Sequence, residues 1–137
     1  MAYKNILIGL CGRGDEKKVI EAAILIADES ECNLTFIHVN DPHTGEMSMM
    51  MDAPDPRYNE SDVYDWISKI DESIAKASTI TVTKSHSIPK AIGAAAEGHD
   101  LIILGHRKQN FFKENFFDSV DEGIVNKVDC PVLVVPK

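Results

Sequence analysis

The chain has 137 residues, 44% hydrophobic and 26% charged, a balance typical of one globular domain. Its formal net charge of −8, with no basic stripe to offset it, argues against nucleic acid as a partner. No apolar run approaches the ~20 residues that cross a bilayer, and Met1–Cys11 predicts a strand rather than a signal peptide. Cys11, Cys32 and Cys130 show neither close pairing nor metal-ligand spacing, so we expect reduced thiols in a cytoplasmic protein.

Short apolar runs alternate with segments of helical period along the chain. The runs bounded by polar residues predict strands at Asn5–Leu10, Asn33–Val39, Thr79–Thr83, Asp100–Leu104 and Val132–Val135. The segments with apolar residues three or four positions apart predict helices at Glu16–Ser30, Glu60–Ala77, Ile88–Glu97 and Val120–Val128.

This alternation indicates parallel pairing with right-handed crossovers, and therefore a single doubly wound α/β domain over residues 1–137. The strand at Thr79–Thr83 alternates polar and apolar residues as an edge strand does, whereas the first and fourth strands are almost entirely apolar. We therefore predict a five-stranded parallel sheet of order 3-2-1-4-5 with four helices. Its ligand crevice should lie where the order reverses, at the C-terminal ends of the first and fourth strands.

The passage from the fourth strand to the last helix, residues 105–120, is where such a domain usually binds phosphate on free helix N–H groups. A phosphate site needs small residues, so that the backbone can approach the anion. This passage instead holds Phe111, Phe112, Phe116 and Phe117, with Asp118 just before the helix. Some of these rings are expected to fill the crevice, and the others to form a patch for a protein partner.

The turn after the first strand, Cys11-Gly-Arg-Gly14, contains part of a dinucleotide fingerprint but has Lys17 at the third glycine position. A flexible turn capped by Asp15 is the favoured interpretation. Cys11 at the crevice mouth is either a sensing thiol or, more commonly for such a residue, a small half-buried hydrophobe. His38, inside the second strand, is expected to be a core or crevice residue.

Several segments spread from end to end carry a family resemblance. They are Met-Ala-Tyr-Lys-Asn-Ile-Leu-Ile at the start, Ile-His-Val at 37–39, Asp-Leu-Ile-Ile-Leu-Gly-His at 100–106 and Cys-Pro-Val-Leu-Val-Val-Pro at 130–136. Together they resemble the universal stress protein family, which implies an adenine nucleotide alpha hydrolase-like fold. Nucleotide-binding members carry Gly-x2-Gly-x9-Gly-(Ser/Thr) after the fourth strand and an acid at the end of the first. This chain keeps Gly105 and Ser119 but has Lys108, Asp118 and Cys11 at the other positions.

The Gly-His start and the aromatic stretch are similar to the branch named for universal stress protein A, whose members generally lack ATP binding. The carboxylates of Asp118, Asp121 and Glu122 would also repel a phosphate at this helix start. We therefore expect no cofactor and no tight ATP binding. The crevice candidates are Leu10, Cys11, Val39, Gly105, His106, Lys108, Ser119 and Val120. The alternative is an ATP- or AMP-binding switch, or a weak phosphotransfer protein, that uses Gly105, Ser119 and the basic loop.

The last predicted strand, Val132-Leu133-Val134-Val135, is apolar and forms an open edge in the predicted order. The resemblance implies that this strand pairs antiparallel with its copy in a homodimer, over a length limited by Pro131 and Pro136. The sequence thus predicts a non-enzymatic, cytoplasmic stress-response protein that acts as a homodimer through unidentified protein partners. We expect no metal, nucleic acid or membrane among its partners.

Overall fold

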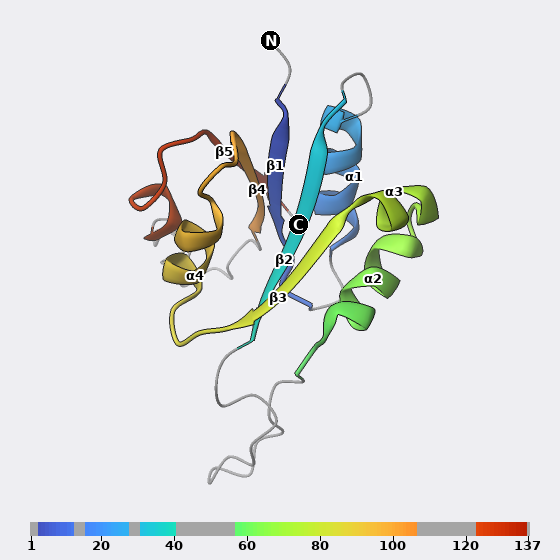
Figure 1. Cartoon of the computed structure of the whole chain (residues 1–137), viewed down its shortest axis with the longest axis horizontal. Coiled ribbons are helices and arrows are strands. Elements are labelled where there is room, and N and C mark those ends of the chain that lie inside the picture. The colour runs from blue at the N-terminus through green and yellow to red at the C-terminus, as the bar shows by residue number, and fades with distance from the viewer. Residues whose placement is uncertain (1–2, 13–15, 28–30, 41–56, 107–122, 137) are drawn as a thin grey trace, which may run out of the picture.

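The computed structural model describes residues 3–12, 16–27, 31–40, 57–106 and 123–136. Five parallel strands form one sheet in the order β3-β2-β1-β4-β5, which confirms the predicted order (Figure 1). The strands are β1 (Asn5–Gly9), β2 (Asn33–Asn40), β3 (Thr79–Lys84), β4 (Leu101–His106) and β5 (Val132–Pro136). Each begins and ends within two residues of its predicted bounds, because changes from apolar to polar residues mark the strand ends.

Helices cover both faces of the sheet (Figure 1). On one face lie α1 (Lys17–Ala27), α2 (Glu60–Ser68) and α3 (Glu72–Ala77), and on the other lie α4 (Ile88–Ala95) and the helical residues 123–125. The fully buried side chains of β1 divide between the two layers, with Ile6 and Ile8 on the α1 side and Leu7 on the α4 side. The almost continuous apolar sequences of β1 and β4 are explained by this cover on both faces.

The helix predicted over Glu60–Ala77 is two helices in the structure. Asp71 has extended backbone angles, and its side chain accepts a hydrogen bond from Ile74 N at 3.1 Å, so that it caps a new helix start. Ile70 and Ile74, on either side of this cap, pack against the same core cluster. The apolar spacing therefore continues across the break, which is why the pattern predicted one helix. The predicted helix Val120–Val128 begins outside the described residues.

Asp100 joins the N-terminal ends of β1 and β4. Its carboxylate accepts backbone N–H bonds from Lys4 at 2.9 Å and Asn5 at 3.0 Å. The hydrogen bond from Lys4 N, which has the largest effect, and the one from Asn5 N hold the pKa of the Asp100 carboxyl below its usual value. The carboxylate thus fixes the register between the first strand and the start of the fourth.

We expect this link to make stability depend on pH. A carboxyl whose folded pKa is depressed stabilises the fold above its unfolded pKa, and the contribution is lost as the pH falls through the folded value. The free energy of unfolding, measured by urea denaturation, should therefore fall more steeply below about pH 4 in the wild type than in Asp100→Asn. Parallel curves for the two proteins would contradict this role of Asp100.

Candidate functional site

The strand order reverses at β1, which pairs with β2 on one side and with β4 on the other. The C-terminal ends of these strands lie at the lower edge of the sheet in Figure 1. Ile8 and Ile103 form the last β1–β4 pair, so Leu10 and Gly105 both lie two residues beyond it on this edge. The structure thus places the ends of β1 and β4 where a doubly wound domain has its ligand crevice.

The predicted crevice residues differ in burial and in the side of the sheet on which they pack. Leu10 is buried in the core on the α1 side, whereas Val39 packs against the cluster on the α4 side. Cys11 is exposed, and Gly105 and His106 are half-buried at the end of β4. Lys108, Ser119 and Val120 lie outside the described residues, as do Phe111, Phe112, Phe116 and Phe117. Their part in the site stays a prediction.

The turn that follows β1 is packed under two aromatic rings. Gly12 has a φ of 78°, in the region that favours glycine. A Cβ at this position would also lie 2.7 Å from the Tyr58 ring and 2.8 Å from the Trp66 ring. The Tyr58 hydroxyl donates a hydrogen bond to Gly12 O at 3.0 Å. The glycine therefore lies where two aromatic side chains pack closely on the backbone, and residues 13–15 of the predicted turn, with its Asp15 cap, lie outside the described residues.

A buried polar network connects this turn to β2. His38 is 5% exposed, and its ring nitrogens lie 2.7 Å from Leu10 O (Nδ1) and 3.0 Å from Asn40 Oδ1 (Nε2). Leu10 O can only accept, so Nδ1 donates to it. Asn40 in turn donates from Nδ2 to Tyr58 O at 2.8 Å and accepts at Oδ1 from Tyr58 N at 3.2 Å. His38 thus joins the ends of β1 and β2, and through Asn40 the segment before α2, from a buried position.

The three rings of this site form a mutual edge-to-face cluster. The His38 centroid lies 5.4 Å from that of Tyr58 and 5.6 Å from that of Trp66, and the Tyr58 and Trp66 centroids are 4.8 Å apart. Such arrangements each contribute about 0.5–1.5 kcal/mol beyond area burial. We call His38, Tyr58 and Trp66 the aromatic cluster.

Trp66 lies within the helix predicted at Glu60–Ala77, as part of its apolar face, whereas no sequence pattern predicted a role for Tyr58. A signal for Tyr58 was present in the helix start that follows it. Asn59 and Asp62 form a capping box, with side-chain to backbone distances of 3.0 and 2.8 Å. An apolar residue directly before such a cap usually packs back onto its own helix. The capping box therefore predicts that Tyr58 packs against its own helix, as it does against Trp66.

The exposure of Cys11 favours its reactivity over that of Cys130. Burial raises the pKa of the Cys130 thiol, and this lowers its thiolate fraction at neutral pH. Limiting iodoacetamide at neutral pH should therefore alkylate Cys11 before Cys130, as measured by peptide mass spectrometry. Cys11→Ser should remove the fastest alkylation, whereas equal rates for all three thiols would argue against a distinct role for Cys11.

The described residues that follow β1, Leu10 to Gly12, include no carboxylate. A carboxylate there would accept hydrogen bonds from ribose hydroxyls, but this chain presents the exposed Cys11 thiol, a weak donor and acceptor. The Tyr58 hydroxyl next to the turn is already bonded to Gly12 O. The fold belongs to the doubly wound α/β class, whose ligands bind at this edge of the sheet.

Comparison with known proteins identifies the family. The model of the universal stress protein family matches residues 2–136, and the chain belongs to this family. The putative universal stress protein SH1215 of Staphylococcus haemolyticus is 28% identical over 142 residues, covering 98% of this chain and 86% of its own length. The putative universal stress protein SAUSA300_1656 of Staphylococcus aureus is 26% identical over 141 residues, covering 98% of this chain and 85% of its own length.

Solved structures share the fold. Universal stress protein UspA from Lactobacillus plantarum superposes with a TM-score of 0.69 at 21% identity, covering 98% of this chain and 99% of its own. A universal stress protein in complex with cAMP has a TM-score of 0.68 at 15% identity, covering 99% of this chain and 98% of its own. The Archaeoglobus fulgidus protein in complex with dAMP has a TM-score of 0.62 at 16% identity, covering 98% and 99%. At these identities the likeness establishes the fold.

Proposed function

We propose that this universal stress protein is a non-enzymatic regulator that acts as a homodimer and does not bind ATP tightly. The observation that carries the proposal is the end of β1, where an exposed thiol at Cys11 takes the place of an acid. Lys108 and Asp118 stand in the sequence where nucleotide-binding members have glycines. A side chain at either position hinders the close approach of phosphate to the backbone.

The proposed dimer rests on β5, which is an edge strand of the sheet. Leu133 and Val134 are 38% and 37% exposed, although both are large and apolar. An edge that presents apolar side chains and unpaired backbone groups favours pairing with another strand. Pairing with a second copy around a two-fold axis would cover the same residues on both protomers.

The alternative is a nucleotide-responsive switch. It is favoured by the relatives of known structure that hold cAMP and dAMP, and by the retention of Gly105 and Ser119 in this sequence. Such a switch would bind through the backbone at the end of β4 and would need no catalytic group. The two proposals differ in whether nucleotide stays with the protein.

Co-purified nucleotide distinguishes the two proposals. Protein purified rapidly without added ligand, then denatured with acid, should release less than about 0.1 equivalent of adenine nucleotide if ATP binds weakly, since weak ligands dissociate on dilution. Release of about one equivalent per protomer would support the switch instead. The analysis uses chromatography of the acid extract with ultraviolet detection.

We place the protein in the cytoplasm because its cysteines are free thiols, as is usual for proteins of reducing compartments. Within the described ranges, no helix is long and apolar enough to cross a bilayer.

A further inference from the structure

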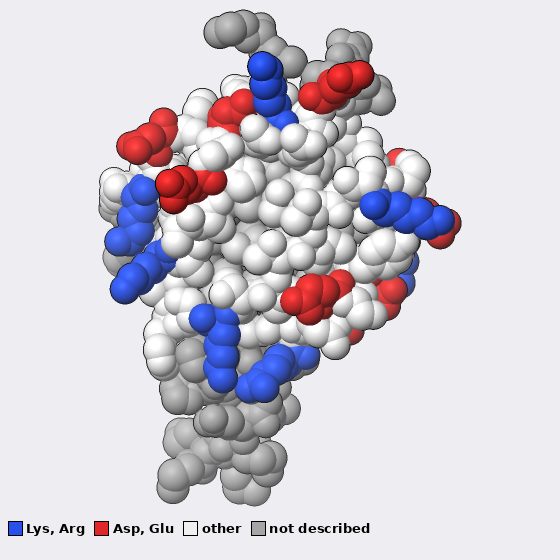
Figure 2. Space-filling view, in the orientation of Figure 1, with Lys and Arg blue, Asp and Glu red and all other residues white. Residues whose placement is uncertain are grey.

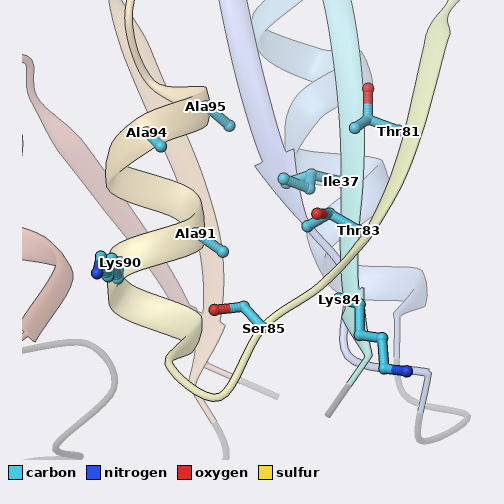
Figure 3. Close-up of a pocket in the computed structure, with 9 residues that line it drawn as sticks. All are labelled: Ile37, Thr81, Thr83, Lys84, Ser85, Lys90, Ala91, Ala94 and Ala95. Carbon is cyan, nitrogen blue, oxygen red and sulfur yellow. The ribbon is translucent and has the colours of Figure 1, made fainter. Parts of the chain in front are cut away.

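A groove of about 500 Å³ lies between α4 and the two strands β2 and β3. Figure 3 shows Ala91 and Ala95 pointing from α4 toward Ile37 and Thr83 on the strands, with Ser85 at the lower end. The groove is lined by Ile37, Thr81, Thr83, Lys84, Ser85, Lys90, Ala91, Ala94 and Ala95. It lies away from the ends of β1 and β4, and none of its lining residues belongs to the aromatic cluster.

The groove exists because short side chains meet across it. α4 contributes only methyl groups toward the sheet at Ala91 and Ala95, so the helix leaves the outer part of the sheet face uncovered. On β3, Ile80 and Val82 pack against the core on the α1 side. The side chains of a strand alternate between the faces, which leaves hydroxyl groups at Thr81 and Thr83 on the α4 side.

The outer edge of β3 is next to this groove. β3 ends the sheet, and no strand among the described residues pairs with it on the side away from β2. Its six residues, Thr79–Lys84, therefore present backbone N–H and C=O groups that an added strand can bind. Extended peptides commonly bind proteins in this way, with the main chain giving affinity and alternate side chains giving specificity.

The charge around the groove is basic in an acidic protein. Lys84 and Lys90 are exposed, and the lining contains no carboxylate, although the chain carries a formal charge of −8. Figure 3 shows Lys84 extending from the end of β3 away from α4, and Lys90 on the first turns of α4. In Figure 2 blue side chains lie along the lower and lower-left rim of this face, where α4 and the end of β3 are found in Figure 1. The two amines thus flank a surface suited to an anionic partner.

We propose that β3 and this groove form a docking site for an extended, acidic segment of a partner protein. The segment adds as a strand beside β3, with every second side chain standing next to Thr81 and Thr83 over the groove. Its carboxylates pair with Lys84 and Lys90. The site lies at the opposite edge of the sheet from β5, so it remains available in the proposed homodimer.

The test uses a short fluorescein-labelled peptide of alternating glutamate and valine, titrated with the full chain and followed by fluorescence anisotropy. We expect saturable binding with a dissociation constant below about 1 mM. Lys84→Glu with Lys90→Glu should weaken it about 10-fold or more. Ala94→Trp, which fills the groove from an exposed helix position, should weaken it as well. Bound peptide should slow hydrogen exchange at the backbone amides of Thr79–Lys84.

The matched control is Lys17→Glu with Lys18→Glu, which changes the net charge equally on exposed residues at the start of α1, a helix that packs on β1, β4 and β5 on the other face of the sheet. This control should leave affinity within about twofold, since screened surface charges act over only ~10 Å. The proposal is overturned if the peptide shows no saturable binding, if both charge-reversed pairs lose affinity equally, or if β5 rather than β3 gains exchange protection. Circular dichroism establishes that each variant is folded.

Discussion

Val134→Glu is expected to convert the proposed homodimer into monomers. Val134 is 37% exposed on the edge strand β5, and each substitution occurs twice in a two-fold interface. Two carboxylates would then meet where two apolar side chains packed, and both would lose water without a partner. The dimer dissociation constant, measured by sedimentation equilibrium, should rise at least about 100-fold.

Ile88→Glu provides a control matched in exposure. Ile88 is 38% exposed, as is Leu133 of β5, but it lies at the start of α4. An acid in the first turn of a helix is well tolerated because it interacts favourably with the helix dipole. This variant should remain dimeric. The dimer proposal is wrong if the wild type sediments as a monomer at all concentrations, or if Val134→Glu leaves the association unchanged.

Asn40→Ala is expected to destabilise the fold by about 2–4 kcal/mol, because it removes one partner from one buried and two part-buried polar contacts. Asn40 is 6% exposed, lies 3.0 Å from His38 Nε2 through Oδ1, and forms hydrogen bonds with Tyr58 N and Tyr58 O. An alanine would leave these groups without this partner beside the rings of the aromatic cluster. Urea denaturation followed by the fluorescence of Trp66, the only tryptophan, measures the change in the free energy of unfolding.

Asn33→Ala is the control, because it also replaces an asparagine of β2 with alanine but leaves the contacts of Asn40 intact. The Asn33 side chain donates to Asn5 Oδ1 at 3.0 Å, but this bond is exposed to water. Its removal should cost less than about 0.5 kcal/mol. Equal destabilisation by both substitutions would mean that the buried network contributes little beyond an ordinary surface contact.

The fold follows from local patterns, and these were readable in the sequence. The nearly continuous apolar runs of β1 and β4 indicated central strands, and the alternation in β3 indicated an edge. These two patterns favoured the order 3-2-1-4-5, which the structure has. The break between α2 and α3 was missed because Ile70 and Ile74 keep helical spacing around the Asp71 cap. A cap is a single polar residue, and it leaves the hydrophobic period intact.

The candidate site was less predictable, because its contacts join distant parts of the chain. Tyr58 lies 46 residues from Gly12, to which its hydroxyl donates. No local pattern specifies that pairing, which depends on how α2 is placed against the end of β1. Sequence did identify His38 as a core or crevice residue, since a histidine inside an apolar strand must be buried near a polar partner.

The proposed functional surfaces occupy different parts of one sheet. The predicted crevice lies at the C-terminal ends of β1 and β4, the proposed dimer contact at β5, and the proposed docking site at β3. A protein whose crevice has lost tight ATP binding would still keep both edges for protein contacts. This arrangement is consistent with regulation through partners rather than through catalysis.

Equilibrium titration with Mg-ATP tests the central proposal most directly. Isothermal titration calorimetry of the full chain should reveal no saturable binding up to about 1 mM, equivalent to a binding free energy weaker than about −4 kcal/mol. A dissociation constant in the micromolar range, about −8 kcal/mol, would contradict it and would establish a nucleotide-binding switch.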